Sequence, residues 1–195
     1  YQAGDFPKLV LEAKKSFASR YAVDSEYWRH FDPAKSPEVI AYLKRNLEDL
    51  ANHYHALYQA SETPEERMAA FTESASWYRQ FLASFPEAPE TPAIHYRLAD
   101  LLLENEAFGP AATEYEHIAY VYPAHERSAA AGYAAIFAHR KNQERAAENQ
   151  REAIRREAVE STVRFVDHFP DHEHAATVLS VAVQDLFDLR EYPRA

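Results

Sequence analysis

Apolar residues recur every three or four positions along two stretches in the first half of the chain. The first stretch begins after Ser36, and its apolar positions are Val39, Ile40, Leu43, Leu47, Leu50, Tyr54 and Leu57. The second, "TPEERMAAFTESASWYRQFLASFP", begins after Thr63 and ends before Pro86. This spacing is typical of amphipathic α-helices, and Ser or Thr followed by Pro is a common helix start. The pattern predicts two helices between residues 36 and 86.

The ending of the second stretch returns twice further along the chain. "YRQFLASFP" has counterparts in "YEHIAYVYP", which ends at Pro123, and in "TVRFVDHFP", which ends at Pro170. Each counterpart is an amphipathic segment that closes on an aromatic residue and a proline. Such a recurrence indicates an architecture built from repeats.

The middle copy has the clearest internal spacing. The positions that define it are His95, Leu98, Ala99, Leu102, Ala111, Tyr115 and Pro123. This spacing resembles the tetratricopeptide repeat, a helix pair in which small residues let the two helices approach closely. His95 stands where the family usually has Trp, and Ala99 stands where it usually has Gly. The resemblance implies an all-α, right-handed solenoid of about eight helices in antiparallel pairs.

The same first-helix signature places the other repeats. It reads Leu50-Ala51-x2-Tyr54, Tyr133-Ala134-x2-Phe137 and Ala182-Val183-x2-Leu186. Separations of 48, 35 and 49 residues between successive signatures predict a long, a short and a long repeat. We therefore expect a single domain over residues 1–195. It begins with the second helix of a truncated repeat at 1–21 and an aromatic-rich connection at 22–36. Three repeats follow at 37–86, 91–123 and 125–170, and the first half of a truncated repeat ends the chain at 172–195.

Two segments have alternative interpretations. The long repeat contains no Gly or Pro in "AHRKNQERAAENQREAIRREAV", so it forms either two long helices that turn near residues 142–148, which we favour, or one unbroken helix. In the aromatic-rich connection, Tyr27, Trp28 and Phe31 either cover the end of the helical stack, which we favour, or form a recognition surface.

Composition agrees with a folded helical protein and excludes some classes of partner. The chain of 195 residues is 47% apolar and 27% charged, with three glycines and no cysteine. So little glycine disfavours the tight turns of an all-β fold. The net charge of -10 disfavours nucleic-acid binding, which needs clustered Lys and Arg. No apolar run is long enough to span a membrane.

Candidate chemistry in the sequence is sparse. The best histidine cluster is "DHFPDHEHAA", in which His168 and His172 have the spacing of helical zinc ligands, but Pro170 lies between them and interrupts the helix that this spacing requires. A polar turn between repeats is the simpler interpretation. The sequence contains no Gly-rich phosphate loop, no H-E-x-x-H motif and no nucleophile elbow. We therefore expect no enzyme activity, no metal and no cofactor.

The resemblance implies a peptide-binding groove instead. In tetratricopeptide arrays the first helix of each pair lines a concave face, and the residues that flank its signature point into it. In this chain those residues are Glu48, Asn52 and His55, then Tyr96, Asp100 and Leu103, then Ala131, Ala135 and Ala138, and finally Gln184 and Phe187. This small, aromatic and acidic set suits a peptide with apolar and basic side chains. The chaperone-recruiting members use a clamp of Lys, Arg and Asn, of which only Asn52 is present.

The recurrent aromatic-Pro ending is similar to the repeats of bacterial envelope proteins, such as the lipoprotein of the outer-membrane β-barrel assembly machinery and the periplasmic coordinator that binds TolA. The similarity covers about residues 64–195 and implies a periplasmic or envelope scaffold that binds a protein or peptide. A structural spacer or self-association module in a larger protein is the alternative. A metal-dependent activity at His168 and His172 is a remote one.

The two ends of the chain repeat one phrase. Phe6-Pro7-Lys8-Leu9 and Tyr192-Pro193-Arg194-Ala195 both read as the turn between the two helices of a pair, because Tyr192 lies 84 residues after Phe108. This predicts a piece cut from a longer array, with apolar faces exposed on the helices around Leu9 and Leu186.

Overall fold

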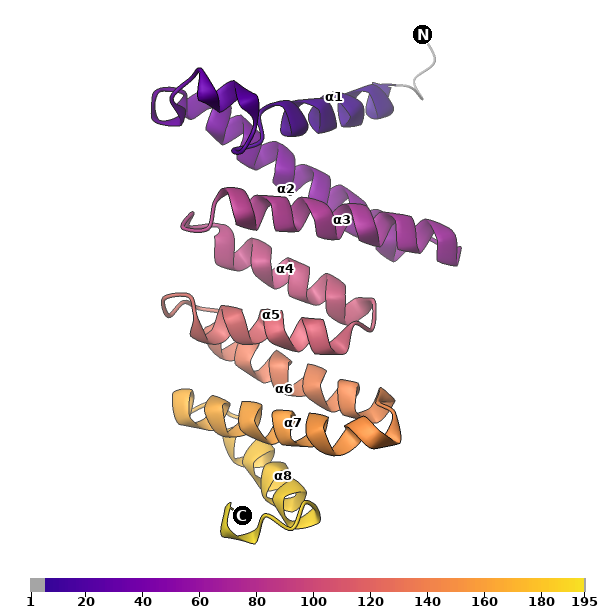
Figure 1. Ribbon diagram of the computed structural model, residues 1–195, viewed down its shortest axis with the longest axis vertical. Coiled ribbons are helices and arrows are strands. Elements are labelled where there is room, and N and C mark those ends of the chain that lie inside the picture. The colour runs from indigo at the N-terminus through magenta and orange to yellow at the C-terminus, as the bar shows by residue number, and fades with distance from the viewer. Residues whose placement is uncertain (1–5, 195) are drawn as a thin grey trace. The chain divides into compact units, whose positions relative to one another are not determined.

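The computed structural model describes residues 6–194, and within them the fold is entirely helical (Figure 1). These residues form eight α-helices and three short 3-10 helices, and no β-strand is found among them. The all-α class and the number of helices predicted from the sequence are thus confirmed. None of the helices in the described part of the chain is both long and apolar enough to cross a membrane.

The chain divides into two compact units, Tyr1–Ile94 and His95–Ala195. The first unit contains α1 (Phe6–Arg20), η1 (Glu26–Arg29), η2 (Pro33–Lys35), α2 (Pro37–Ala60) and α3 (Pro64–Ser84). The boundary lies within α4 (Thr91–Glu104), which continues into the second unit. There it is followed by α5 (Phe108–Tyr120), α6 (Ser128–Arg145), α7 (Glu148–His168), α8 (Ala175–Asp188) and η3 (Tyr192–Arg194).

Local sequence signals set the ends of these helices. Thr63 is the N-cap of α3: its hydroxyl accepts a hydrogen bond from the Glu66 amide at 3.3 Å and donates one to the Glu66 carboxylate at 2.9 Å. Pro64 follows at the first helical position, where its missing N–H costs nothing. Ser36 and Pro37 begin α2 in the same order, although the Ser36 side chain makes no capping hydrogen bond.

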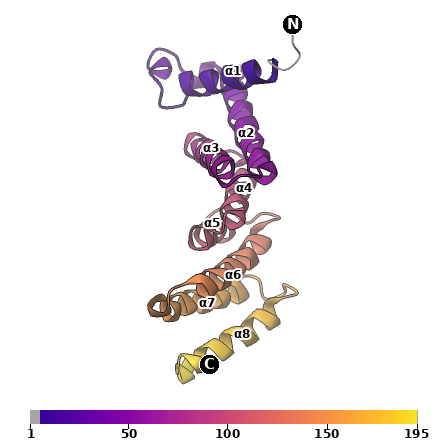
Figure 2. The ribbon, with the colours of Figure 1, turned by 90° about the vertical axis from the view of Figure 1, so that its right-hand side faces the viewer.

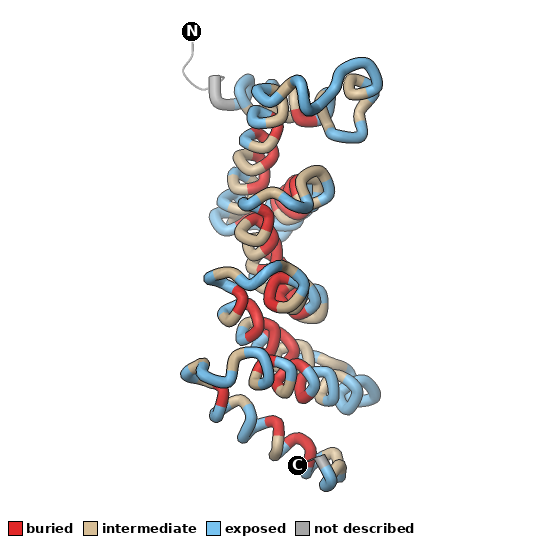
Figure 3. The backbone as a smooth tube through the Cα atoms, turned by 90° about the vertical axis from the view of Figure 1, so that its left-hand side faces the viewer, coloured by how far each residue is buried: buried red, intermediate tan, exposed pale blue. Residues whose placement is uncertain are grey.

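The core of the first unit lies between α2 and α3. Its apolar members on α2 are Leu43, Leu47, Leu50, Ala51 and Tyr58, and those on α3 are Ala70, Ala75, Trp77, Tyr78 and Phe81. Buried and exposed residues alternate along α2, as Figure 3 shows, which is the burial pattern of an amphipathic helix. Helix α1 is joined to this pair by ion pairs from Lys14 to Asp49 and from Lys15 to Glu73.

The core of the second unit is built from helices that pack in chain order. Helix α6 contacts α5 and α7, and α7 contacts α8 (Figure 2). One buried cluster joins Ile136, Phe165 and Ala175, and a second joins Val159, Ala182 and Leu186. Buried apolar surface therefore connects α6, α7 and α8 through two separate clusters.

The long repeat forms two helices, as the favoured interpretation predicted. Helix α6 ends at Arg145 and α7 begins at Glu148, so the turn consists of Ala146 and Ala147. Both turn residues have extended backbone conformations, with ψ angles of 146° and 149°. The unbroken helix is excluded.

The aromatic residues of the 22–36 connection pack mainly against one another. The Tyr27 ring lies 4.6 Å from Tyr21, 4.9 Å from Trp28 and 4.5 Å from Phe31, measured between ring centroids. The Trp28 indole N–H donates to the Tyr21 carbonyl at 3.0 Å. Tyr27 and Trp28 are half-buried and Phe31 is exposed. The cluster therefore covers the C-terminal end of α1 only in part.

The two helices at the ends of the chain differ in their apolar exposure. On α1, Leu9 is 66% exposed, as predicted. On α8, Leu186 itself is buried against Val159, and the exposed large apolar residues are Leu179, Val181 and Phe187. The helix around Leu186 thus has exposed apolar residues, as predicted, although Leu186 is not one of them.

Candidate binding face

The predicted α2 residues Glu48, Asn52 and His55 share one half-buried face of that helix. Their spacing of four and three residues places them above one another along the helix surface. None of the three belongs to the buried core, so this face can be reached from solvent.

The hydroxyl of Tyr78 holds two of these residues in place. It donates a hydrogen bond to Asn52 Oδ1 at 3.0 Å and lies 3.1 Å from His55 Nδ1. Because the hydroxyl has one proton, Nδ1 of His55 must be the donor in the second bond. Tyr78 is fully buried, so its hydroxyl holds the Asn52 amide and the His55 imidazole from the core side of α2. No pattern in the sequence pointed to this role of Tyr78.

An open cleft of about 560 Å³ lies on the same side of α2. It is lined by Pro33, Ala34, Pro37, Ile40, Ala41, Lys44, Arg45, Glu48, Phe81 and Glu90. We name it the Glu48 cleft. Lys44 pairs with Glu90 at 3.5 Å and lies over the Phe85 ring. An apolar floor with charged groups around it is the usual composition of a small recognition pocket.

In the second unit, the predicted α4 residues Tyr96, Asp100 and Leu103 are also half-buried. The Tyr115 hydroxyl, from α5, donates to Asp100 Oδ1 at 2.5 Å, and the Tyr96 ring meets the Tyr115 ring edge-on at 5.4 Å. The Arg127 guanidinium lies 5.3 Å from the centre of the Tyr96 ring. Aromatic, acidic and basic groups therefore meet on this side of α4.

Burial and the Asp100 carboxylate raise the pKa of both tyrosines. For Tyr115, desolvation is the largest cause, followed by its hydrogen bond to Asp100, and the pKa lies far above its usual value. For Tyr96, desolvation again comes first, then the charge of Asp100, while Arg127 acts in the opposite direction. Both phenols are therefore neutral hydrogen-bond donors across the physiological pH range.

The predicted α6 residues are placed differently. Ala131, Ala135 and Ala138 are fully buried, so they cannot line a binding face. Tyr133 and Phe137, assigned to the core by the signature, are 36% and 47% exposed. The buried positions of α6 lie two residues before those that the signature indicated.

The correct alignment runs through the glycine of α6. Ala131, Gly132 and Ala135 lie 33 residues after Leu98, Ala99 and Leu102, and all six are buried. Tyr-Ala-x2-Phe looked like the signature because it has large residues at the outer positions. Gly132 was the signal that could have shown the buried face, because a glycine inside a helix often marks a close approach of another element. The exposed face of α6 is thus aromatic instead of small.

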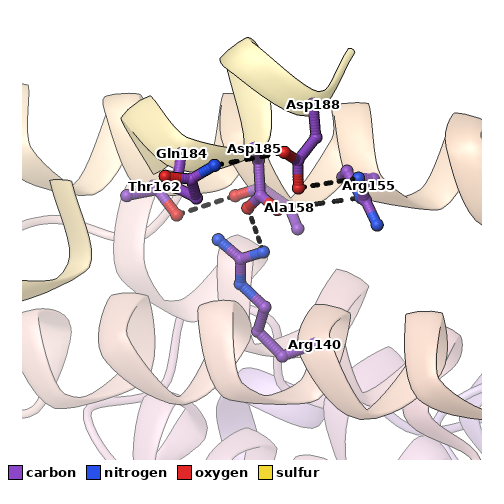
Figure 4. A network of polar contacts seen from close by, with 7 residues as sticks. All are labelled: Arg140, Arg155, Ala158, Thr162, Gln184, Asp185 and Asp188. Carbon is purple, nitrogen blue, oxygen red and sulfur yellow. Dashed lines mark hydrogen bonds and ion pairs between the residues drawn. The ribbon is translucent and has the colours of Figure 1, made fainter. Parts of the chain in front are cut away.

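Gln184 and Phe187 of α8 have separate surroundings. Gln184 donates to Asp188 Oδ1 at 3.1 Å, and Asp188 lies 3.4 Å from Arg155 of α7 (Figure 4). The neighbouring Asp185 is buried, pairs with Arg140 of α6, and lies 3.7 Å from Nε of Arg155. Gln184 is thus at the edge of a network that fastens α8.

Phe187 is 51% exposed, and its ring contacts Tyr192 at 5.7 Å. Together with Leu179 and Val183 it forms a stripe at every fourth position of α8. This stripe is apolar, and two of its members are exposed.

The histidine cluster does not form a metal site. His168 bonds through Nδ1 to the Arg164 carbonyl at 2.8 Å, whereas the His172 ring lies against Phe165 at 5.0 Å and Tyr133 at 5.8 Å. Within residues 6–194, no group of three or more His, Asp or Glu side chains is arranged to hold a metal ion. Helix α7 ends at His168, so His168 and His172 do not lie on one helix, as Pro170 in the sequence indicated.

Comparison with known proteins adds no family assignment. No protein-family model matches the sequence, and the search among curated proteins likewise finds no match.

Proposed function

We propose that this chain is a non-enzymatic scaffold of tetratricopeptide-like helix pairs that binds a peptide or protein segment on the face lined by the first helix of each pair. The observation that carries the proposal is the Glu48 cleft, an open cavity of about 560 Å³ on the α2 face that the sequence singled out. The paired order of the helices and the fixed orientation of Asn52 and His55 support it.

The chemistry of the face favours a segment with apolar and basic side chains. Pro33, Pro37, Ile40 and Phe81 form an apolar part of the Glu48 cleft that suits one aliphatic or aromatic side chain. On the second unit, Asp100 places a carboxylate beside the half-buried Tyr96 and the buried Tyr115. The exposed Tyr133 and Phe137 extend this aromatic character to α6. Aromatic anchors of this kind often dominate binding energies in protein interfaces.

Selection from a random 12-residue peptide library displayed on phage tests the proposal. The unmodified chain should enrich peptides with an apolar residue next to Lys or Arg. Ala41 is exposed and lines the cleft, so Ala41→Arg fills it without disturbing the core. We expect this variant to weaken binding of the enriched peptides about tenfold or more.

The matched control is Ala153→Arg, the same change at an exposed position of α7. It should leave binding unchanged. If the library gives no enriched sequence, or if Ala41→Arg and Ala153→Arg bind equally well, the Glu48 cleft is not the binding site.

A structural spacer or self-association module is the second candidate. The exposed apolar residues Leu9 and Phe187, on the first and last α-helices, favour it, because exposed apolar patches often mark interaction surfaces. Sedimentation equilibrium of the chain and of Phe187→Glu separates the two candidates. Self-association that Phe187→Glu abolishes supports the second.

A role in the bacterial envelope is part of the proposal and rests on the sequence resemblance alone. The complete gene sequence tests it directly, because an export signal or lipoprotein leader would be encoded before Tyr1.

A further inference from the structure

A second cleft, of about 800 Å³, lies at the far end of the α2–α3 pair. It is lined by Tyr54, Leu57, Ala60, Ser61, Glu62, Thr63, Glu66, Ala69, Ala70 and Glu73. None of these residues lines the Glu48 cleft. We name it the hairpin cleft, because it is formed by the end of α2, the start of α3 and the turn between them.

Helix α1 meets the α2–α3 pair at one edge of the hairpin cleft. Helix α1 has 15 residues, whereas α2 has 24 and α3 has 21. Lys15 of α1 contacts Tyr54 and Glu73, and these two residues form the edge of the cleft. The turns of α2 beyond Tyr54 extend past this contact.

The walls of the hairpin cleft include accessible apolar surface. Leu57 is 42% exposed, and its neighbour across the cleft, Ala69, is exposed as well. Tyr54 is half-buried and adds an aromatic edge. A volume of about 800 Å³ is within the range of cavities that hold a ligand of several side chains.

The rim of the cleft is acidic. Glu62 is exposed, and no ion pair to it is found in the described part of the chain. Glu66 accepts a hydrogen bond from Thr63 and has no cationic partner among the described residues. Glu73 accepts from the Trp77 indole at 2.9 Å and from Lys15 at 3.1 Å, so its charge is balanced. Two carboxylates of the rim, Glu62 and Glu66, therefore lack a cationic side-chain partner among the described residues.

The helix ends strengthen this negative potential. Helix α2 ends at Ala60 with no basic residue in its last turn, so the negative end of its dipole is not neutralised. The positive end of α3 is already compensated by Glu65 and Glu66 in its first turn. A cation is favoured over an anion at this cleft.

We propose that the hairpin cleft is a second docking site, separate from the Glu48 cleft, for a peptide segment in which apolar side chains are flanked by Lys or Arg. The apolar side chains lie against Leu57 and Ala69, and the flanking cations lie near Glu62 and Glu66. The apolar contact supplies affinity, and the carboxylates select the sign of the partner's charge.

Nuclear magnetic resonance titration with short probes tests this site. The probe is the tetrapeptide acetyl-Lys-Leu-Leu-Lys-amide, added to the ¹⁵N-labelled chain. We expect saturable amide shifts at residues 54–73 that persist in Ala41→Arg, with a dissociation constant of about 1 mM, the range expected for so short a ligand. Acetyl-Glu-Leu-Leu-Glu-amide tests the charge selection, and acetyl-Lys-Ser-Ser-Lys-amide tests the apolar contact. Neither should produce these shifts.

Two variants with matched controls locate the binding. Ala69→Arg fills the cleft and adds a positive charge, and it should weaken binding about tenfold or more, whereas Ala41→Arg in the other cleft should not. Glu62→Gln should weaken binding by up to about fivefold, because the loss of one exposed ion pair changes affinity by about this much. Its control is Glu87→Gln, at an exposed position after α3, which should leave binding unchanged.

Three results would overturn the proposal. The first is equal shifts with the Lys and Glu tetrapeptides. The second is unchanged binding by Ala69→Arg. The third is concentration-dependent broadening of the 54–73 amides in the free chain, which would show that a second copy occupies the cleft. Each result leaves the Glu48 cleft untouched, because its test uses Ala41→Arg.

Discussion

Replacing Gly132 with alanine should destabilise the second unit, although alanine is the better helix former. Gly132 is buried within α6, where α5 and α7 pack closely against it. A Cβ atom at this position would lie 2.9 Å from Cδ2 of Phe165, 3.1 Å from the Tyr120 hydroxyl and 3.2 Å from Cε2 of Phe169. The first of these distances is shorter than any ordinary carbon–carbon contact.

The balance of two opposing effects gives the magnitude. Alanine in a helix interior gains about 1 kcal/mol over glycine. Overpacking a tight core costs about 1–3 kcal/mol, and the upper end applies because three aromatic side chains surround the new atom and Phe165 is fully buried. We therefore expect Gly132→Ala to lower the free energy of unfolding by about 2 kcal/mol.

Gly109, in the same unit, provides the matched control. A Cβ there would meet only the Asn142 side chain, with Nδ2 at 3.3 Å, and a flexible amide can rotate away. Gly109→Ala in the first turn of α5 should therefore be neutral or stabilising by about 0.5 kcal/mol, because it reduces the entropy of the unfolded chain. Urea unfolding followed by circular dichroism measures both variants in the same cooperative unit.

A double-mutant cycle then identifies the cause. Phe165→Leu removes the nearest atom, so it should cost less in the Gly132→Ala background than in the unmodified chain, with a coupling of about 1 kcal/mol. Gly132→Ala as stable as the unmodified chain would refute the argument from close packing. Strictly additive effects would show that Phe165 is not the obstacle.

Two further predictions concern the polar groups of the second unit. Asp185→Asn weakens the pairing with Arg140 and Arg155 and should cost about 2 kcal/mol in urea unfolding, whereas Asp188→Asn, at a far more exposed carboxylate, should cost at most about 0.5 kcal/mol. Equal costs would contradict the network in Figure 4. Burial, and secondarily the charge of a nearby carboxylate, raises the pKa of Tyr120 to about 12. This raised pKa favours the neutral folded form, so its contribution to stability is intact below pH 10 and is lost as the pH rises from 10 to 12. Tyr120→Phe should make the free energy of unfolding fall less between pH 10 and pH 12 than it does in the unmodified chain. An equal fall in both proteins would contradict the assignment.

Helix positions could be predicted from the sequence because their signals are local. The Thr63 cap and Pro64 gave the start of α3, and the absence of Gly and Pro allowed the two long helices after residue 125 to be anticipated. The α2 part of the candidate face could be predicted from the same helical periodicity, because Glu48, Asn52 and His55 lie on one side of α2 wherever that helix packs.

The sequence by itself determined the all-α class, the number of helices and most of their bounds. The tertiary structure alone decided which side of α6 is buried. Tyr133 and Phe137 have the pattern of core residues, but their helix packs through Gly132, because only a residue without a side chain fits against Phe165. It also decided that Asp185 is a buried anchor for α8, since its partners come from two other helices. Spacing along a chain predicts a helix and its periodicity, whereas the choice of packed face depends on contacts that are distant in sequence.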